Sequence, residues 1–186
     1  MYRIVEPVTI EPMTVADVRE HLRLADLIEA DLITGLIQSA REYCENYTRC
    51  AFATQTLELL LYRFPSTRII YLPAPPLQEV LSIKTIDSSG SETTLLPGSY
   101  VVDTEGEIGR VILNTNENWP AFEPYPNWPV RIRFKAGFVS LPQSLKQAML
   151  LLIGHWYENR EATGTASGSV AFSVHALLSM FRVGVF

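Results

Sequence analysis

The sequence predicts an α+β fold, in which a helical bundle carries an antiparallel β-rich insertion. Apolar residues recur at helical spacing in the first third of the chain and again after Pro142. Between about residues 54 and 136, short runs of β-favouring residues alternate with turn residues instead. Helices are therefore expected at about 14–48 and 142–161. We expect one domain over residues 1–186, which ends in a flexible hinge and an apolar tail at 162–186.

The first two helices are predicted from a capping signal and an apolar face. Thr14 suits an N-cap, and Asp17 three residues later makes an imperfect capping box, so a short helix should span residues 14–22. A second helix is expected from about Leu27 to Tyr47. Its apolar face comprises Ile33, Ile37, Ala40, Cys44 and Tyr47, widened by Leu32, Leu36 and Tyr43. A stripe this wide must pack on more than one neighbour.

The middle of the chain reads as short strands joined by turns. The expected strands are 54–64, 69–72, 80–87, 91–95, 100–103, 110–113 and 130–134. In the first of them, Leu57, Leu59 and Leu61 alternate on one face. A hairpin turn is expected at residues 88–90, where Ser-Ser-Gly separates two runs, and a Gly-containing turn at 104–109.

An aromatic loop is expected before the last strand, over residues 114–129. It contains four X-Pro bonds and the aromatic residues Trp119, Phe122, Tyr125 and Trp128. Such aromatics most often fix a loop to its own domain. They can instead form a platform on which a sugar or a base stacks, which would make the protein a small ligand-binding module. The sequence leaves both interpretations open.

The C-terminal third is predicted to be helical and then apolar. Leu145, Ala148, Met149, Leu152 and Trp156 form one stripe, and Leu150, Leu151 and Ile153 make the helix apolar almost all round. Some of that burial is expected to come from another subunit. Residues 162–169 read as a flexible connector, and residues 170–186 either dock on a partner or fold back on the core. The candidate contact residues are Leu150, Leu151, Trp156, Phe172, Leu177, Leu178, Phe181 and Phe186.

The charge balance argues against a protein that grips DNA. Charged residues make up 19% of the chain and the net charge is -5, whereas tight phosphate binding calls for a positive balance. Arg131, Arg133 and Lys135 nevertheless project from one face of the last strand, because they alternate in sequence. We interpret them either as a basic contact ridge or as the solvated face of an antiparallel strand.

No catalytic or metal-binding motif is present, so we expect no enzyme, no cofactor and no metal. The chain has no phosphate-binding loop, dinucleotide fingerprint, Gly-x-Ser-x-Gly or Cys-x-x-Cys. His155 and Glu158 share a helix face but lack a third ligand. Cys44 and Cys50 are expected to be reduced thiols in a protein made in the cytoplasm. No signal peptide or membrane span is predicted.

Several short sequence segments occur together in the order typical of one family. They are residues 14–23, the stretch AREYCENYT at 40–48, QT at 55–56, RFP at 63–65, LPAPPL at 72–77 and HWYENREA at 155–162. In this ordered set the chain resembles the head-tail connector (adaptor) family of long-tailed bacteriophages, prophages and gene transfer agents. The resemblance covers nearly the whole chain. It departs after Thr48, where the family often has a glycine and this chain has Arg49.

The resemblance implies a structural protein of the virion neck, assembled in the host bacterial cytoplasm. Its subunits would form a ring, typically of twelve, below the portal protein. The ring would extend the DNA channel, let DNA pass without specific binding and dock the next neck or tail-completion protein. The family implies no catalytic residue, no cofactor and no membrane partner.

Overall fold

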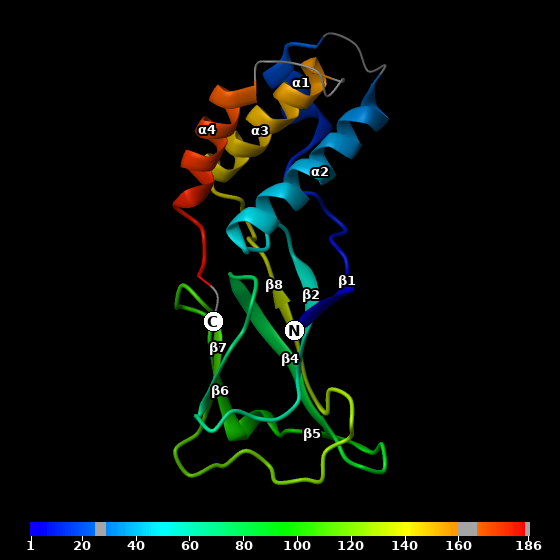
Figure 1. The fold of residues 1–186 in the computed structure, drawn as a ribbon, viewed down its shortest axis with the longest axis vertical. Coiled ribbons are helices and arrows are strands. Elements are labelled where there is room, and N and C mark those ends of the chain that lie inside the picture. The colour runs from blue at the N-terminus through cyan, green and yellow to red at the C-terminus, as the bar shows by residue number, and fades with distance from the viewer. Residues whose placement is uncertain (25–28, 160–166, 185–186) are drawn as a thin grey trace. The chain divides into compact units, whose positions relative to one another are not determined.

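The computed structural model describes residues 1–24, 29–159 and 167–184, which hold four α-helices and eight β-strands (Figure 1). The chain divides into two compact units. We call residues 1–9 and 54–137 the β unit, and residues 10–53 and 138–184 the helical unit. The predicted α+β class is confirmed. The expectation that residues 1–186 form a single domain stays a prediction.

The β unit contains a five-stranded antiparallel sheet in the order β1-β2-β8-β4-β5. Its strands are β1 (Tyr2–Glu6), β2 (Gln55–Leu61), β8 (Val130–Ala136), β4 (Leu77–Ile86) and β5 (Glu92–Thr94). The strand β1, which forms the edge of this sheet by pairing with β2, is not among the strands predicted from the sequence. The predicted hairpin turn at 88–90 is confirmed between β4 and β5, and Gly90 supplies its positive φ of 86°.

A three-stranded sheet, in the order β3-β7-β6, completes the β unit. Its strands are β3 (Ile69–Tyr71), β7 (Arg110–Leu113) and β6 (Tyr100–Asp103), and the last two have the predicted bounds. The buried residues of the two sheets include Leu57, Ile83, Ile132, Phe134, Ile70, Val111 and Leu113. Burial of this apolar surface is the main stabilising contribution to the unit.

The turn between β6 and β7 lies against the apolar face of the five-stranded sheet. A Cβ atom at Gly109 would come within 2.2 Å of the Leu77 Cβ, so only glycine fits there. Leu77 pairs with Ala136 of β8 and belongs to the same buried face as Phe134. The β6–β7 turn is therefore on the opposite side of the sheet from the alternate side chains Arg131, Arg133 and Lys135.

The helical unit packs four helices around one core. They are α1 (Val15–Leu22), α2 (Ala30–Thr48), α3 (Gln143–Glu158) and α4 (Ser167–Ser179). The capping box at α1 is complete, because the Thr14 side chain accepts a hydrogen bond from Asp17 N and Asp17 accepts one from Thr14 N. The predicted start of the second helix at Leu27 lies outside the described residues, and so does the predicted end of the third at 161.

Most of the predicted helix faces are buried. Ile33, Ile37, Ala40 and Cys44 of α2 are buried, as are Leu145, Ala148, Met149 and Leu152 of α3. Leu32 and Tyr43 are each 39% exposed. The prediction that Leu32 widens the buried face of α2 is therefore wrong, whereas Tyr43, although partly exposed, contacts Trp156 of α3 and His175 of α4. Cys44 and Cys50 are free and buried, and burial raises the pKa of the Cys44 thiol to about 12.

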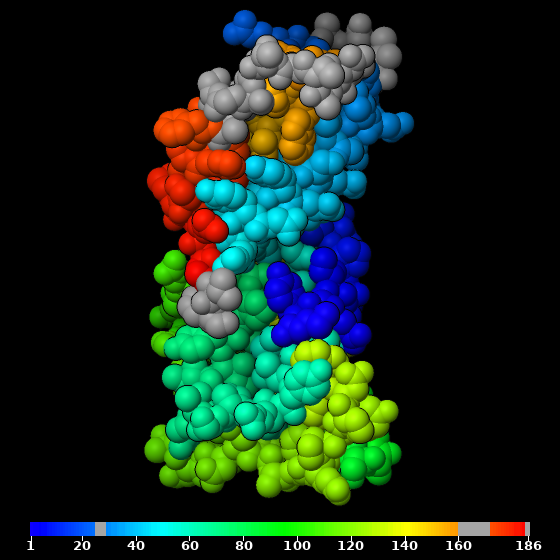
Figure 2. Space-filling model, viewed as in Figure 1, coloured from blue at the N-terminus to red at the C-terminus, as the bar shows by residue number. Residues whose placement is uncertain are grey.

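The apolar tail folds back on its own unit. α4 begins at Ser167, inside the stretch predicted as a flexible connector, whose residues 162–166 are not described. α4 packs on α3 and α2 and buries Val174 and Leu178 completely, because these two residues are spaced by one helical turn. Figure 2 shows α4 in orange and red against α2 in cyan. Beyond the helix, Val183 N donates to Thr48 O at 2.9 Å.

Candidate functional site

The polar face of the five-stranded sheet brings acidic and basic side chains together. Arg131, Arg133 and Lys135 of β8 all project from this face, as predicted. Each lies near a carboxylate of another strand of the sheet: Lys135 Nζ is 2.7 Å from Glu79, Arg133 Nη2 is 3.3 Å from Glu58, and Arg131 Nη1 is 3.9 Å from Glu92. The face is therefore a pattern of ion pairs, and its role as a contact ridge stays a prediction.

Glu58 is the most enclosed carboxylate of this face. Its side chain is only 5% exposed, and it accepts hydrogen bonds from Arg3 Nη2 at 2.6 Å and Arg3 Nε at 3.0 Å. Arg133 Nη2 adds a third at 3.3 Å. The register places Arg3 and Arg133 directly opposite Glu58 on the two flanking strands. Two guanidinium groups thus share one carboxylate and supply the hydrogen bonds that so buried a polar group requires.

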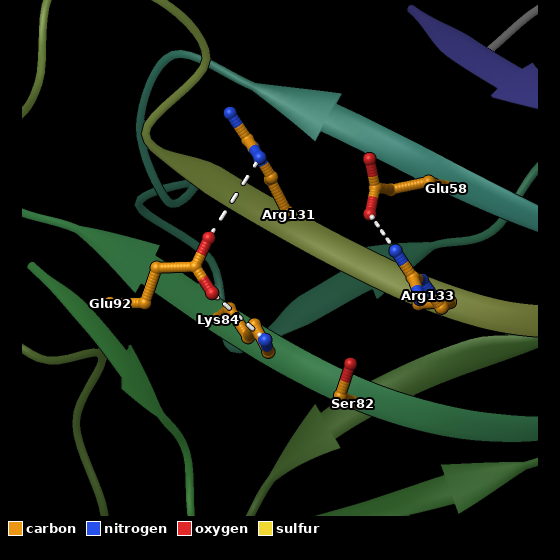
Figure 3. Close-up of a pocket in the computed structure, with 6 residues that line it drawn as sticks. All are labelled: Glu58, Ser82, Lys84, Glu92, Arg131 and Arg133. Carbon is orange, nitrogen blue, oxygen red and sulfur yellow. Dashed lines mark hydrogen bonds and ion pairs between the residues drawn. The ribbon is translucent and has the colours of Figure 1, made fainter. Parts of the chain in front are cut away.

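A small hollow opens beside this group (Figure 3). Its lining residues are Glu58, Ser82, Lys84, Glu92, Arg131 and Arg133, from four neighbouring strands. Lys84 Nζ donates to Glu92 at 2.8 Å, and this hydrogen bond lowers the pKa of the Glu92 carboxyl below its ordinary value. The Nε atom of Arg131 is buried and has no hydrogen-bond acceptor among the described residues. We call this site the cation hollow, because three cations face two carboxylates in it.

The candidate contact residues of the C-terminal segment differ in exposure. Leu178 is fully buried and Leu150 is 7% exposed, so both fill the core of the helical unit. Leu151, Trp156, Leu177 and Phe181 are half-buried. Phe172 is 76% exposed, and Phe186 lies outside the described residues. Whether the accessible members touch another subunit stays a prediction.

An aromatic group on the helical unit was not found by sequence reasoning. Tyr43 Oη lies 3.0 Å from His175 Nε2, and the Tyr47 ring stacks on His175 with centroids 4.8 Å apart. Trp156 meets Tyr43 edge-on at 6.2 Å, and Arg182 lies over Tyr47. These residues come from α2, α3 and α4 and from the chain just beyond α4, so no local spacing could reveal the group. It fixes the position of α4 on the bundle.

The aromatic loop packs on its own unit. Trp119 stacks on Phe64 with centroids 4.6 Å apart and donates from Nε1 to Thr67 O at 2.8 Å. Trp128 stacks on Tyr62 at 4.0 Å, and Phe122 meets Phe64 edge-on. The interpretation that these aromatic residues fix the loop to its own domain is confirmed. Trp119 and Trp128 are each engaged in intramolecular stacking.

His155 lies beside the polar side chain of Asn159, whose Nδ2 is 3.2 Å from the His155 Nδ1. Within residues 1–24, 29–159 and 167–184, no group of three His, Cys, Asp or Glu residues could hold a metal ion. In the same ranges, no helix is long and apolar enough to cross a membrane.

Comparison with known proteins agrees with the resemblance noted in the sequence. A chain from the neck of an empty gene transfer agent particle, computed with C6 symmetry, has a TM-score of 0.84 and 27% identity, over 100% of this chain and 97% of that one. A chain from the virion of a native gene transfer agent particle has a TM-score of 0.81 and 26% identity, with the same coverage. A chain from the native neck, computed with C12 symmetry, has a TM-score of 0.80 and 26% identity.

No curated protein matches the chain. The family model for head completion proteins matches residues 11–176. The predicted resemblance to head-tail adaptors of phages and gene transfer agents is thereby confirmed. Since the matched segment covers most of the sequence and runs through both units, the chain belongs to the head completion protein family.

Proposed function

We propose that this chain is a structural adaptor of the neck of a tailed phage or of a gene transfer agent-like particle. Twelve copies form a ring below the portal, extend the DNA channel and dock the next neck or tail-completion protein. The similarity that supports this most directly is the match of the whole chain to a neck chain in a particle computed with C12 symmetry. The function lies in contact surfaces, so the protein does no chemistry on a substrate.

The charge distribution suits a wall along which DNA slides. The net charge is -5, and the basic side chains of β8 each lie within 4 Å of a carboxylate. A surface without an excess of cations neutralises few phosphates, so it releases few counterions and holds DNA weakly. DNA would pass such a ring without specific binding.

The exposed side of α4 is the part of the helical unit best suited to contact the portal or a neighbouring subunit. α4 contains no Asp, Glu, Lys or Arg, which is unusual for a helix that faces water. Phe172 is 76% exposed, and Leu177 and Phe181, further along the same segment, are half-buried. Together with Leu151 and Trp156 of α3, they offer apolar surface for which association is favourable.

Assembly of the purified full-length chain tests this proposal. We expect sedimentation velocity and negative-stain images to show closed rings of twelve copies of a 20.9 kDa chain, alone or with the portal protein of the same genome. Phe172→Asp should weaken assembly, whereas Val139→Asp, at a position that is 91% exposed on the β8–α3 connection, should not. A chain that stays monomeric and ignores the portal under all these conditions contradicts the proposal.

A further inference from the structure

We propose that the cation hollow receives the acidic β6–β7 turn of a second copy of this chain, so that Glu105 and Glu107 of one subunit dock beside Lys84 and Arg131 of the next. This inference rests on the proposed ring. It adds a specific contact between the β units of adjacent subunits.

The hollow has the features of a site that lacks one anion. Arg131 Nε is buried without an acceptor, and the nearest carboxylate, Glu92, is 3.9 Å from Arg131 Nη1. That distance is beyond a hydrogen bond. Glu92 is already engaged by Lys84 at 2.8 Å (Figure 3). A further carboxylate would pair with the accessible part of the Arg131 side chain, which is 32% exposed.

The acidic turn has the features of a ligand that lacks a partner. Asp103 accepts hydrogen bonds from Arg110 Nε at 2.8 Å and from Glu105 N at 3.0 Å, so its carboxylate is satisfied within the turn. Glu105 and Glu107 are exposed, and neither carboxylate makes an ion pair or a hydrogen bond with any described residue. Two carboxylates on one tight turn repel each other and gain from a shared cation.

The positions of the two sites suit a ring. A closed ring uses a heterologous interface, in which two different patches meet, so the patches must lie on different sides of each subunit. The hollow is on the polar face of the five-stranded sheet, whereas the turn lies on the apolar side, where Gly109 contacts Leu77. A rotation about the ring axis also brings each β unit next to the β unit of the neighbour, at the same height.

The charge of the hollow favours a carboxylate over a DNA strand. Three cations and two carboxylates line it, which leaves an excess of about one positive charge. One carboxylate balances that excess, and the second of the turn stays near the rim, where water screens its charge. A DNA strand requires a row of uncompensated cations instead. We therefore assign the hollow to the second copy, and binding of DNA phosphates becomes an alternative that the experiment distinguishes.

Two reversed variants, tested separately and mixed, examine this contact. The hollow variant carries Lys84→Glu and Arg131→Glu, and the turn variant carries Glu105→Lys and Glu107→Lys. Each alone places like charges at every contact, so we expect assembly to require at least about tenfold more protein than the wild type. In an equimolar mixture every contact is again complementary if the two variants alternate, and rings should return at the wild-type concentration. Arg63→Glu and Glu117→Lys, at exposed positions of the same unit, serve as matched controls and should assemble normally.

The outcomes separate this inference from the proposed function. A wild type that never forms rings refutes both. A wild type that forms rings, together with variants that assemble equally well, refutes only the contact, and so does a mixture of folded variants that fails to recover. If the hollow variant keeps its ring but retains less duplex DNA, the hollow binds phosphate and the inference is wrong. Because Glu105 and Glu107 lie in an exposed turn, the turn variant tests the contact even if the hollow variant does not fold.

Discussion

The two units hold their ionic groups in different environments. In the helical unit, Arg41 is only 9% exposed, and its Nε and Nη1 atoms lie 2.8 Å from Glu11 and Glu45 respectively. Glu45 also accepts a hydrogen bond from Phe52 N at 2.7 Å. In the β unit, by contrast, Lys84, Glu92 and Lys135 pair on an open sheet face, with side chains 39–43% exposed, although Glu58 of the same face is enclosed.

The buried ionic groups of the helical unit contribute to stability, whereas the exposed ionic groups of the β unit are suited to recognition. The Arg41 cluster ties three segments together, namely the chain before α1, the helix α2 and the chain before β2, and it does so away from water. Removing one member of a buried cluster leaves the others unpaired, which is strongly destabilising. Exposed pairs contribute little to stability because water competes for both charges. The exposed charged side chains of the β unit are therefore available to bind a partner of complementary charge.

The largest expected effect is the loss of Arg41. Arg41→Met leaves Glu11 and Glu45 without their cation, and we expect the free energy of unfolding to fall by about 3 kcal/mol. Lys135→Met in the β unit should lower it by less than about 1 kcal/mol. Urea denaturation of both variants measures the two losses. Equal losses would remove the distinction between the two units.

The next largest effect concerns packing in the β unit. Gly109→Ala would place a Cβ atom 2.2 Å from the Leu77 Cβ, and we expect this to lower the free energy of unfolding by about 2 kcal/mol. Leu77→Ala should not rescue the variant, because the Leu77 Cβ itself is the nearest atom. Thermal melts of the single and double variants test this. A rescued double variant would show that the turn moves freely relative to the sheet.

A smaller, pH-dependent effect is expected at the partly exposed ion pair that joins α1 and α3. The hydrogen bond from Lys146, together with those from Thr14, lowers the pKa of Asp17 from 3.8 to about 2. A lowered pKa in the folded state means that the unfolded state binds the proton more tightly. The stabilising contribution is therefore complete above the unfolded value of 3.8 and is lost as the pH falls towards 2.

Asp17→Asn should remove this dependence and cost about 1 kcal/mol at neutral pH, mainly through the weakened cap and ion pair. Denaturation of both proteins at pH values between about 5 and 2 measures it. Parallel curves for the two proteins would contradict the assignment.

The smallest effect is a gain in stability at the end of α2. Arg49 closes this helix in the left-handed conformation with φ of 64°, which costs less for glycine than for residues with a Cβ. Arg49→Gly should raise the free energy of unfolding by about 0.5 kcal/mol. Arg49→Ala, which keeps the Cβ, is the control and should give no gain. A loss with glycine would indicate that the Arg49 side chain stabilises the helix end.

Local patterns predicted much of this fold. The hairpin of β6 and β7 was predicted at its observed bounds, because its strands and its turn are contiguous in sequence. The strand β1 was missed, since its partner β2 lies some fifty residues away and its exposed side chains give no burial pattern. The exposure of Tyr43 and the burial of Leu150 also depend on which helices pack beside them, and spacing along one helix does not show this.

The candidate site was only partly visible in the sequence. Alternation along β8 predicted that Arg131, Arg133 and Lys135 share a face, and they do. Their carboxylate partners come from other strands, so the register of the sheet was needed to find them. The cation hollow depends on β2, β4, β5 and β8 together, and no local motif marks it.

The particles made when this gene is deleted test the central claim most directly. If the chain is a neck adaptor, electron microscopy of the lysate should show heads without tails and separate tails, and a plasmid copy of the gene should restore joined particles. Joined, infectious particles in normal numbers without the gene would contradict the claim that this chain connects head and tail.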